Sequence, residues 1–237
     1  MSGLSYIAPL ISSLEKAANA KEAQVMKKYM KNNFNFYGVR APQCKAILKQ
    51  HIQKTGLPNS MAHLSSVIQC AWQAECRELQ YIGMYIMDKS QDVWQVGGQE
   101  LQDIFEYMIT NKSWWDTVDF ISSSLIHYWW KSDSDLLDKS LAPAWSKSEN
   151  MWLNRTSIIY QLRRKNETNC DILEEHIMRH NHSNEFFLQK AIGWALREYA
   201  KIDSKWVQNF VATHDLKPLS KREALKQIKA GRIKRPW

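Results

Sequence analysis

One kind of segment recurs along the second half of this chain, and it limits the fold more than any other feature does. Segments that start at residues 114, 151, 186 and 218 each follow a polar stretch and then place apolar residues at helical spacing. They read WWDTVDFISSSLI, MWLNRTSIIYQL, FFLQKAIGWAL and PLSKREALKQI, and their starts lie 37, 35 and 32 residues apart. A helical repeat of this period predicts stacked helix pairs, an α-solenoid of HEAT-like type. Ordinary helical packing with coincidental spacing is the alternative.

Strand signals are nearly absent from the sequence. There are 8 glycines and 6 prolines, and no Asn-Gly or Asp-Gly pair separates two alternating apolar runs. The segments ELQYIGMYIMDK, ELQDIFEYMIT and KAIGWALREYAK have three- and four-residue apolar spacing. Polar breaks fall at TGLPNS, KSDSD, KSEN, HNHSNE and HDLKPLS, and most of them are suited to cap the following helix. The sequence therefore predicts an all-α protein.

Length and composition exclude several classes of protein. At 237 residues the chain is long enough for a sizeable core, and we expect a single domain over residues 1–237. No run of about eighteen apolar residues predicts a membrane span, and the N-terminus lacks the pattern of a signal peptide. The four cysteines are scattered and suit neither a zinc site nor a disulfide framework. We expect a cytoplasmic location.

The charge of the chain indicates a polyanionic partner. Lys and Arg total 32 against 24 Asp and Glu, which gives a formal net charge of +8 and a pI near 9.2. Nucleic acid is the first candidate, because the neutralisation of phosphates releases condensed counterions. A basic protein without such a partner is the alternative.

The repeat also places this charge. Arg155, Lys190 and Arg222 each lie four residues after the start of their segment, near the start of a helix. Successive units of a solenoid would align these cations along one basic concave surface, where helix N-termini also offer free N–H groups to phosphates. We expect this groove to bind duplex DNA, and we add Arg197 and Lys221 to the residues that contact it.

The segment NKSWWDTVDFI, residues 111–121, raises a separate question. A helix that begins after Ser113 carries Asp116 in its first turn, where a carboxylate interacts favourably with the helix dipole. Asp119 lies deeper, among apolar neighbours, and shares a helix face with Trp115. A carboxylate in such a place costs several kcal/mol unless it is paired or used. A salt bridge to Arg155 of the next repeat is one explanation.

The other explanation is that Asp119 stabilises transient positive charge. Cleavage of a glycosidic bond passes through an oxocarbenium-like sugar, which a fixed carboxylate stabilises. Trp115 and a second indole such as Trp194 would then form walls around a positively charged nucleoside, because aromatic faces attract cations. The chain has no zinc-deaminase signature and no glycine-rich nucleotide loop.

These segments also resemble a known family. NKSWWDTVDFI, MWLNRTSIIYQL, EFFLQKAIGWALREYAK and PLSKREALKQIK are similar to motifs of the AlkD family of bacterial DNA alkylation-repair glycosylases. YMKNNFNFYGVRAPQ, residues 29–43, resembles that family's lesion-recognition helix and the loop after it. The motifs are colinear from about residue 20 to about residue 230, so the resemblance is more specific than a shared fold.

The resemblance implies a C-shaped helical-repeat protein that excises positively charged N3- and N7-alkylated purines, such as 3-methyladenine and 7-methylguanine, from double-stranded DNA. It implies excision without flipping of the base into a pocket. Trp115 and Asp119 would be catalytic, Trp194 would complete the aromatic pair around the deoxyribose, and Arg155 would contact DNA at the site. An alkylated purine cation is already a good leaving group, so one carboxylate suffices without a general acid. We expect a monomer without metal or organic cofactor that acts at the bacterial nucleoid.

One position departs from the family pattern. Arg40 stands where a known member has a glutamine that faces the minor groove near the lesion, and it should add affinity for phosphates or the groove. Tyr29 and its neighbours are present, which favours the active branch of the family over relatives without glycosylase activity. A DNA-binding repeat protein without catalysis is the main alternative. A helical scaffold that binds an acidic peptide is the more distant one.

Overall fold

The chain is built from helices and the turns that join them. The computed structural model describes residues 2–94 and 98–231, and within these two ranges every regular element is helical. The closest approach to strand pairing in this part of the chain is an isolated bridge between Asn35 and Cys76. The all-α prediction is therefore confirmed for the described residues.

The recurring segments of the sequence are helix starts. α12 begins at Met151, α14 at Phe186 and α16 at Pro218, which are the first residues of three of the segments. The remaining segment starts α8 at Trp115, with Trp114 immediately before the helix. The spacing predicted from the sequence is thus the spacing between the starts of four helices.

Side chains of the polar breaks cap several of these helices. Asn150 accepts hydrogen bonds from the backbone N–H groups of Trp152 and Leu153 at 2.9 and 3.3 Å, and these bonds satisfy two of the donors that a helix start leaves open. Ser60 and Asp133 cap α4 and α10 in the same way. The breaks predicted at KSEN, TGLPNS and KSDSD therefore end one helix and cap the next.

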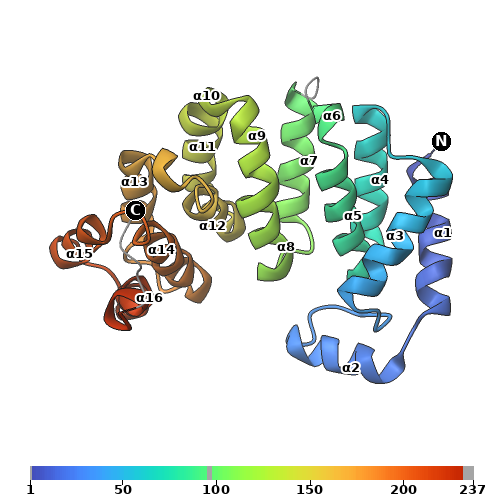
Figure 1. Ribbon diagram of the computed structural model, residues 1–237, viewed down its shortest axis with the longest axis horizontal. Coiled ribbons are helices and arrows are strands. Elements are labelled where there is room, and N and C mark those ends of the chain that lie inside the picture. The colour runs from blue at the N-terminus through green and yellow to red at the C-terminus, as the bar shows by residue number, and fades with distance from the viewer. Residues whose placement is uncertain (1, 95–97, 232–237) are drawn as a thin grey trace. The chain divides into compact units, whose positions relative to one another are not determined.

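The chain divides by its internal packing into two units, one up to Lys112 and one from Ser113. The single domain expected from the length of the chain stays a prediction. In the first unit, helices α1, α4, α5 and α7 lie side by side, with α3 against α1 and α5 (Figure 1). The helices of this unit are α1 (Gly3–Lys16), α2 (Ala20–Tyr29), α3 (Ala41–Thr55), α4 (Met61–Gln73), α5 (Arg77–Lys89), α6 (Gln91–Trp94) and α7 (Gly98–Thr110).

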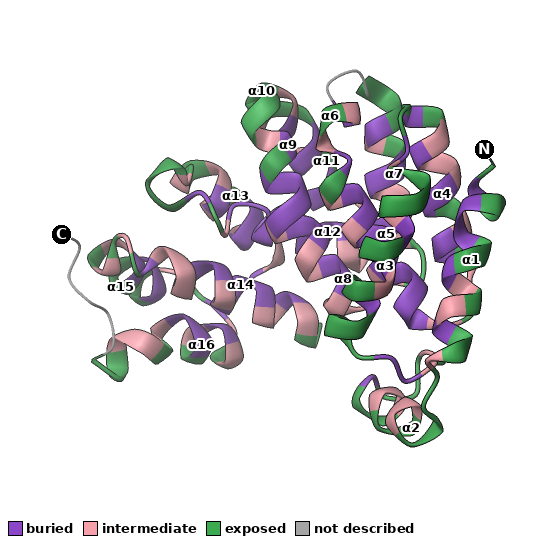
Figure 2. Ribbon diagram, turned by 45° about the vertical axis from the view of Figure 1, so that its right-hand side comes forward, coloured by how far each residue is buried: buried purple, intermediate pink, exposed green. Residues whose placement is uncertain are grey.

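Helix α2 is the exception in the first unit, since none of its residues is buried, whereas α4 and α5 bury much of their surface (Figure 2). Apolar side chains of the other helices form the core, among them Leu10, Leu64, Ile82 and Phe105, which are all fully buried. The burial of such side chains is the main term that favours folding.

The second unit carries the recurring segments. Its helix α12 contacts α8, α11, α13 and α14, and α14 packs along α16. Fully buried Ile158, Ile192 and Leu196 lie in the core between these helices. The elements of this unit are α8 (Trp115–Phe120), the π-helical η1 (Ile121–Leu125), α9 (Ile126–Ser132), α10 (Ser134–Leu136), the π-helical η2 (Leu137–Leu141), α11 (Ala142–Ser146), α12 (Met151–Ile159), the 3₁₀ turn η3 (Lys165–Glu167), α13 (Cys170–His180), α14 (Phe186–Tyr199), α15 (Ser204–Thr213) and α16 (Pro218–Lys229).

Candidate functional site

The residues singled out by the repeat occupy one register position in their helices. Asp119 is the fifth residue of α8, Arg155 the fifth of α12, Lys190 the fifth of α14 and Arg222 the fifth of α16. Where the starts of neighbouring parallel helices are aligned, equal register places such residues at the same level, because each helix rises by about 1.5 Å per residue. The level is one turn inside the helix starts.

The carboxylate of Asp119 and the guanidinium of Arg155 form a two-bond ion pair at this level. Nε of Arg155 donates to Oδ1 of Asp119 at 2.7 Å, and Nη2 donates to Oδ2 at 2.9 Å. The remaining nitrogen, Nη1, donates to the backbone carbonyl of Phe187 at 2.5 Å. Arg155 therefore ties the starts of α8, α12 and α14 together.

Burial makes this pair unlike an ion pair on the surface. The Arg155 side chain is 5% exposed and that of Asp119 is 19% exposed. Burial raises the pKa of the Asp119 carboxyl above its ordinary value, while the hydrogen bonds and charge of Arg155 oppose that rise. A carboxylate oxygen has two lone pairs, so each Asp119 oxygen retains one after its bond to Arg155. The Asp119 carboxylate is thus fixed, is close to water on one side, and can still accept further hydrogen bonds.

The helix that carries Asp119 changes its winding directly after it. The π-helical segment η1 begins at Ile121, and such segments are frequent at functional sites. Two serines of this region donate to the carbonyls four residues earlier, Ser122 to Val118 and Ser123 to Asp119. Ser122 also shares a hydrogen bond with Thr156 of α12, at 2.9 Å. The sequence analysis did not predict this segment.

An aromatic cluster lies beside the ion pair, and the sequence analysis assigned it no role. Trp114 lies 5.0 Å from Phe187 and 5.9 Å from Trp152 between ring centroids, and Trp152 lies 4.9 Å from Phe187. The guanidinium carbon of Arg155 lies 5.9 Å from the centroid of the Phe187 ring. Each ring comes from the first residues of one recurring segment, so the aromatic openings of the repeat were the signal for this cluster.

The two tryptophans expected to be catalytic are half-buried. Trp115 is the first residue of α8, one turn before Asp119. Trp194 lies one turn after Lys190 on α14 and packs partly against the core of the second unit. Both rings combine contact with the protein and exposure to solvent, as a wall of a binding site requires.

The cations expected in a groove differ in how far their charge is already balanced. Lys190 and Arg197 both pair with Glu223, at 3.2 and 2.7 Å. Burial raises the pKa of Glu223, but the neighbouring cations outweigh burial and lower it, so this carboxylate stays ionised. Lys221 lies 3.9 Å from Asp215, whereas Arg222 is exposed.

The segment that resembles a recognition element belongs to the first unit. Tyr29 is the last residue of α2 and is 65% exposed. Arg40 is exposed at the start of α3 and pairs with Glu22 of α2, with Nε to Oε2 at 2.8 Å. Most of residues 29–43 form the loop between α2 and α3 rather than a helix.

A buried carboxylate fixes that loop. Glu78 of α5 accepts hydrogen bonds from the backbone N–H groups of Tyr37, Gly38 and Val39 at 2.8 to 3.1 Å. Gly38 has a φ of +84°, and a Cβ there would lie 2.1 Å from the carbonyl oxygen of Asn19. The loop thus needs glycine at this position.

The described ranges hold neither a metal site nor a membrane-spanning helix. No group of three or more His, Cys, Asp and Glu side chains that could hold a metal ion occurs there. No helix among these residues has the length and apolar character needed to cross a membrane.

The second unit thus offers a fixed carboxylate that is held by an arginine one turn inside the helix starts, with an aromatic cluster beside the pair, on an all-helical frame. Residues 10–228 match the model of a family described as DNA alkylation repair enzyme. The chain therefore belongs to that family. It is also similar to a solved structure described as a predicted DNA alkylation repair enzyme from Enterococcus faecalis, with 32% identity over 88% of this chain and 95% of that chain and a TM-score of 0.80. A comparison with curated proteins gave no match.

Proposed function

We propose that this member of the family is a DNA glycosylase that hydrolyses the N-glycosidic bond of positively charged N3- and N7-alkylated purines in duplex DNA. The observation that carries the proposal is Asp119, a carboxylate fixed by two hydrogen bonds and still partly exposed. We further propose that the helices continue as a HEAT-like solenoid with a basic groove that holds the duplex. The chain would work as a monomer in the bacterial cytoplasm.

Each group has a defined task in this reaction. The bond between C1′ and the purine nitrogen breaks, its electron pair neutralises the cationic base, and the sugar becomes oxocarbenium-like. Asp119 stabilises that charge and orients the water that attacks C1′, with the lone pairs that Arg155 leaves open. Trp115 and Trp194 wall the deoxyribose and the cationic nucleoside. Arg155 keeps Asp119 in place and contacts the DNA.

The substrate itself supplies what other glycosylases build into a pocket. A neutral base needs a general acid on its leaving nitrogen, whereas an alkylated purine already carries the positive charge. The base therefore need not enter a deep pocket, which agrees with a site at the level of helix starts. Tyr29 and Arg40, on and after α2, are the residues proposed to meet the duplex from the first unit.

Both oxygens of Asp119 bond to Arg155, and this favours a second candidate, a DNA-binding repeat protein without catalysis. A carboxylate whose task is only to pair with arginine needs no exposed edge and no indole beside it. The two functions differ in what happens when the charge of Asp119 is removed.

Asp119→Asn tests the proposal. We expect single-turnover release of 7-methylguanine from methylated duplex to fall about a hundredfold or more per folded molecule, as for other fixed charge stabilisers. Asp116→Asn removes a carboxylate from the same helix and should leave release nearly unchanged. Both variants are melted to correct for the folded fraction. Full release by a folded Asp119→Asn protein would contradict the catalytic role, and no release by the unaltered protein would favour the DNA-binding alternative.

A further inference from the structure

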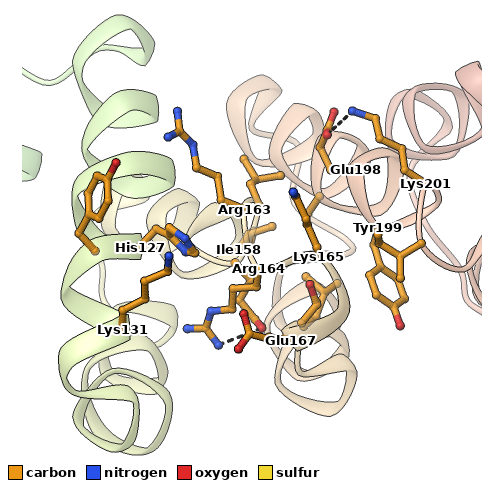
Figure 3. Close-up of a pocket in the computed structure, with 17 residues that line it drawn as sticks. His127, Lys131, Ile158, Arg163, Arg164, Lys165, Glu167, Glu198, Tyr199 and Lys201 are labelled. Atoms are coloured by element: carbon orange, nitrogen blue, oxygen red, sulfur yellow. Dashed lines mark hydrogen bonds and ion pairs between the residues drawn. The ribbon is translucent and has the colours of Figure 1, made fainter. Parts of the chain in front are cut away.

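A cavity of the second unit lies at the other end of the site helices. It has a volume of about 710 Å³ and opens between the ends of α9, α12 and α14 (Figure 3). α9 contributes His127 and Lys131, the chain after α12 contributes Arg163 and Lys165, and the end of α14 contributes Glu198. Asp119 does not line it. We name this cavity the basic pocket.

Two of the cations that line the basic pocket are already balanced. Arg164 is fully buried and forms a two-bond pair with Asp138, at 2.7 and 2.9 Å. The rings of Trp130 and Tyr160 lie against its guanidinium, with centroids 4.0 and 4.5 Å from the guanidinium carbon. Lys201 pairs with Glu198. Arg164 is therefore a rigid part of the pocket rather than a free charge.

Three cations of the basic pocket are not balanced. Lys131, Arg163 and Lys165 are exposed, and among the residues that the structure describes none of them has a carboxylate at ion-pair distance. Apart from Glu198, the acidic side chain in the lining is Glu167, so three positive charges face one negative charge. Helix C-termini also attract cations, and this interaction alone would explain the presence of any one of the three cations.

Two of these cations, Lys131 and Arg163, act on a histidine of the basic pocket. His127 is 8% exposed, and its Nδ1 is buried without a hydrogen-bond partner among the described residues. Burial lowers the pKa of His127, and the charges of Lys131, Arg163 and Arg164 lower it further, while the charge of Glu167 opposes them. Lys131 of α9 and Arg163, after α12, thus line one cavity together with this ring. A cavity with such cations and an unused imidazole nitrogen suits a phosphate group.

We infer that the basic pocket binds a backbone phosphate of the same duplex whose damaged nucleotide lies at Asp119. The inference rests on the proposed DNA substrate. α8, η1 and α9 follow one another from Trp115 to Ser132 without a break, so Asp119 and Lys131 are twelve residues or about 18 Å apart along them. The grooves of B-DNA are narrower, about 12 and 6 Å. A duplex over Asp119 therefore brings a second backbone within reach of the Lys131 and Arg163 side chains.

The test compares two double variants in binding to undamaged duplex at several salt concentrations. Lys131→Gln with Arg163→Gln removes two exposed cations of the basic pocket, and Lys205→Gln with Lys229→Gln removes two exposed cations of the same unit outside it. The slope of log K against log salt should flatten by about 1.8 for the pocket pair, at about 0.9 per phosphate contact, and stay the same for the control pair. Equal slopes for the two pairs would overturn the inference.

Lys165 allows a third substitution in the basic pocket that does not disturb the loop. Its φ is +54°, a backbone conformation that glycine adopts without strain. Lys165→Gly therefore removes the charge and should not lower the melting temperature, and added to the pocket pair it should flatten the slope by about 0.9 more. An unchanged slope would exclude this lysine from the phosphate site.

Competition with inorganic phosphate distinguishes the two possible sources of the phosphate group, the DNA backbone and a small phosphorylated ligand. In a titration followed by the ring protons of His127, duplex DNA should displace phosphate from the unaltered protein. Phosphate that stays bound in the presence of saturating duplex would overturn the inference in favour of a small phosphorylated ligand. The binding assays use undamaged duplex, so absent release of 7-methylguanine would contradict the proposed reaction and leave the pocket assignment standing.

Discussion

At the scale of the residue, Arg155 is the clearest case of one side chain with several tasks. A guanidinium has five N–H donors in a planar fork, and here three nitrogens bond to Asp119 and to the Phe187 carbonyl. Lysine carries the same charge at a single point and cannot span these acceptors. The choice of arginine at this position is therefore explained by the structure before any role toward DNA is considered.

Replacement of Arg155 should first lower stability. Arg155→Ala leaves a largely buried carboxylate without its donor, and we expect a loss of about 3–5 kcal/mol in the free energy of unfolding. The free energy of unfolding of Arg155→Lys should lie between those of Arg155→Ala and the unaltered protein. Arg179→Ala, which breaks an exposed pair within one helix, serves as the control and should have little effect. Weaker DNA binding by a fully stable Arg155→Ala protein would show that the pair is not structural.

At the scale of the element, α13 contains a histidine that links stability to pH. His176 is fully buried, and its Nδ1 donates to the carbonyl of Ser157 at 2.8 Å, because a carbonyl only accepts. Its Nε2 is buried and has no partner in the described part of the chain. Burial lowers the pKa of His176, although the bond to Ser157 opposes this. The neutral ring is thus the form that fits the fold.

The sign of the pH effect follows from that direction. A folded-state pKa below the unfolded value of about 6.5 gives stability that is complete above pH 6.5 and is lost as the pH falls. One such histidine contributes up to about 1.4 kcal/mol per pH unit. We expect His176→Asn, which keeps a donor for Ser157, to have a flatter decline of unfolding free energy between pH 7 and 5. His182→Asn, at an exposed ring, is the control; equal declines in all three proteins would refute the assignment.

The starts of the helices could be predicted from the sequence, whereas the winding within them could not. Helix starts were predictable because the signal is local, as with Asn150, which caps α12 through its own neighbours. The π-helical winding after Asp119 was not predictable from the sequence. Ser122 bonds both to Val118 of its own helix and to Thr156 of α12, and only tertiary packing decides between the two kinds of winding. Pairing of Asp119 with Arg155 was foreseen as one of two explanations. The basic pocket was missed because its lining comes from three separated segments.

At the scale of the whole molecule, the net charge of +8 overstates what is available to a polyanion. Arg155 and Arg164 are buried against carboxylates, and Lys190 and Arg197 share Glu223. Charges already paired within the protein release fewer counterions when DNA binds, since the phosphate competes with an existing partner. Exposed cations without such partners therefore decide the salt dependence.

Pairing within the protein ranks the groove cations in a way that sequence register alone does not. Arg222→Ala should flatten the slope of log K against log salt by about 0.9, because its charge faces solvent. Lys190→Ala should flatten it by less, because Glu223 already offsets part of that charge. Both changes should weaken binding to all sequences alike, as contacts to phosphates do. Fluorescence anisotropy with two unrelated duplexes measures this order, with Lys205→Ala as the control. A larger change for Lys190 than for Arg222 would show that the Glu223 pair opens when DNA binds.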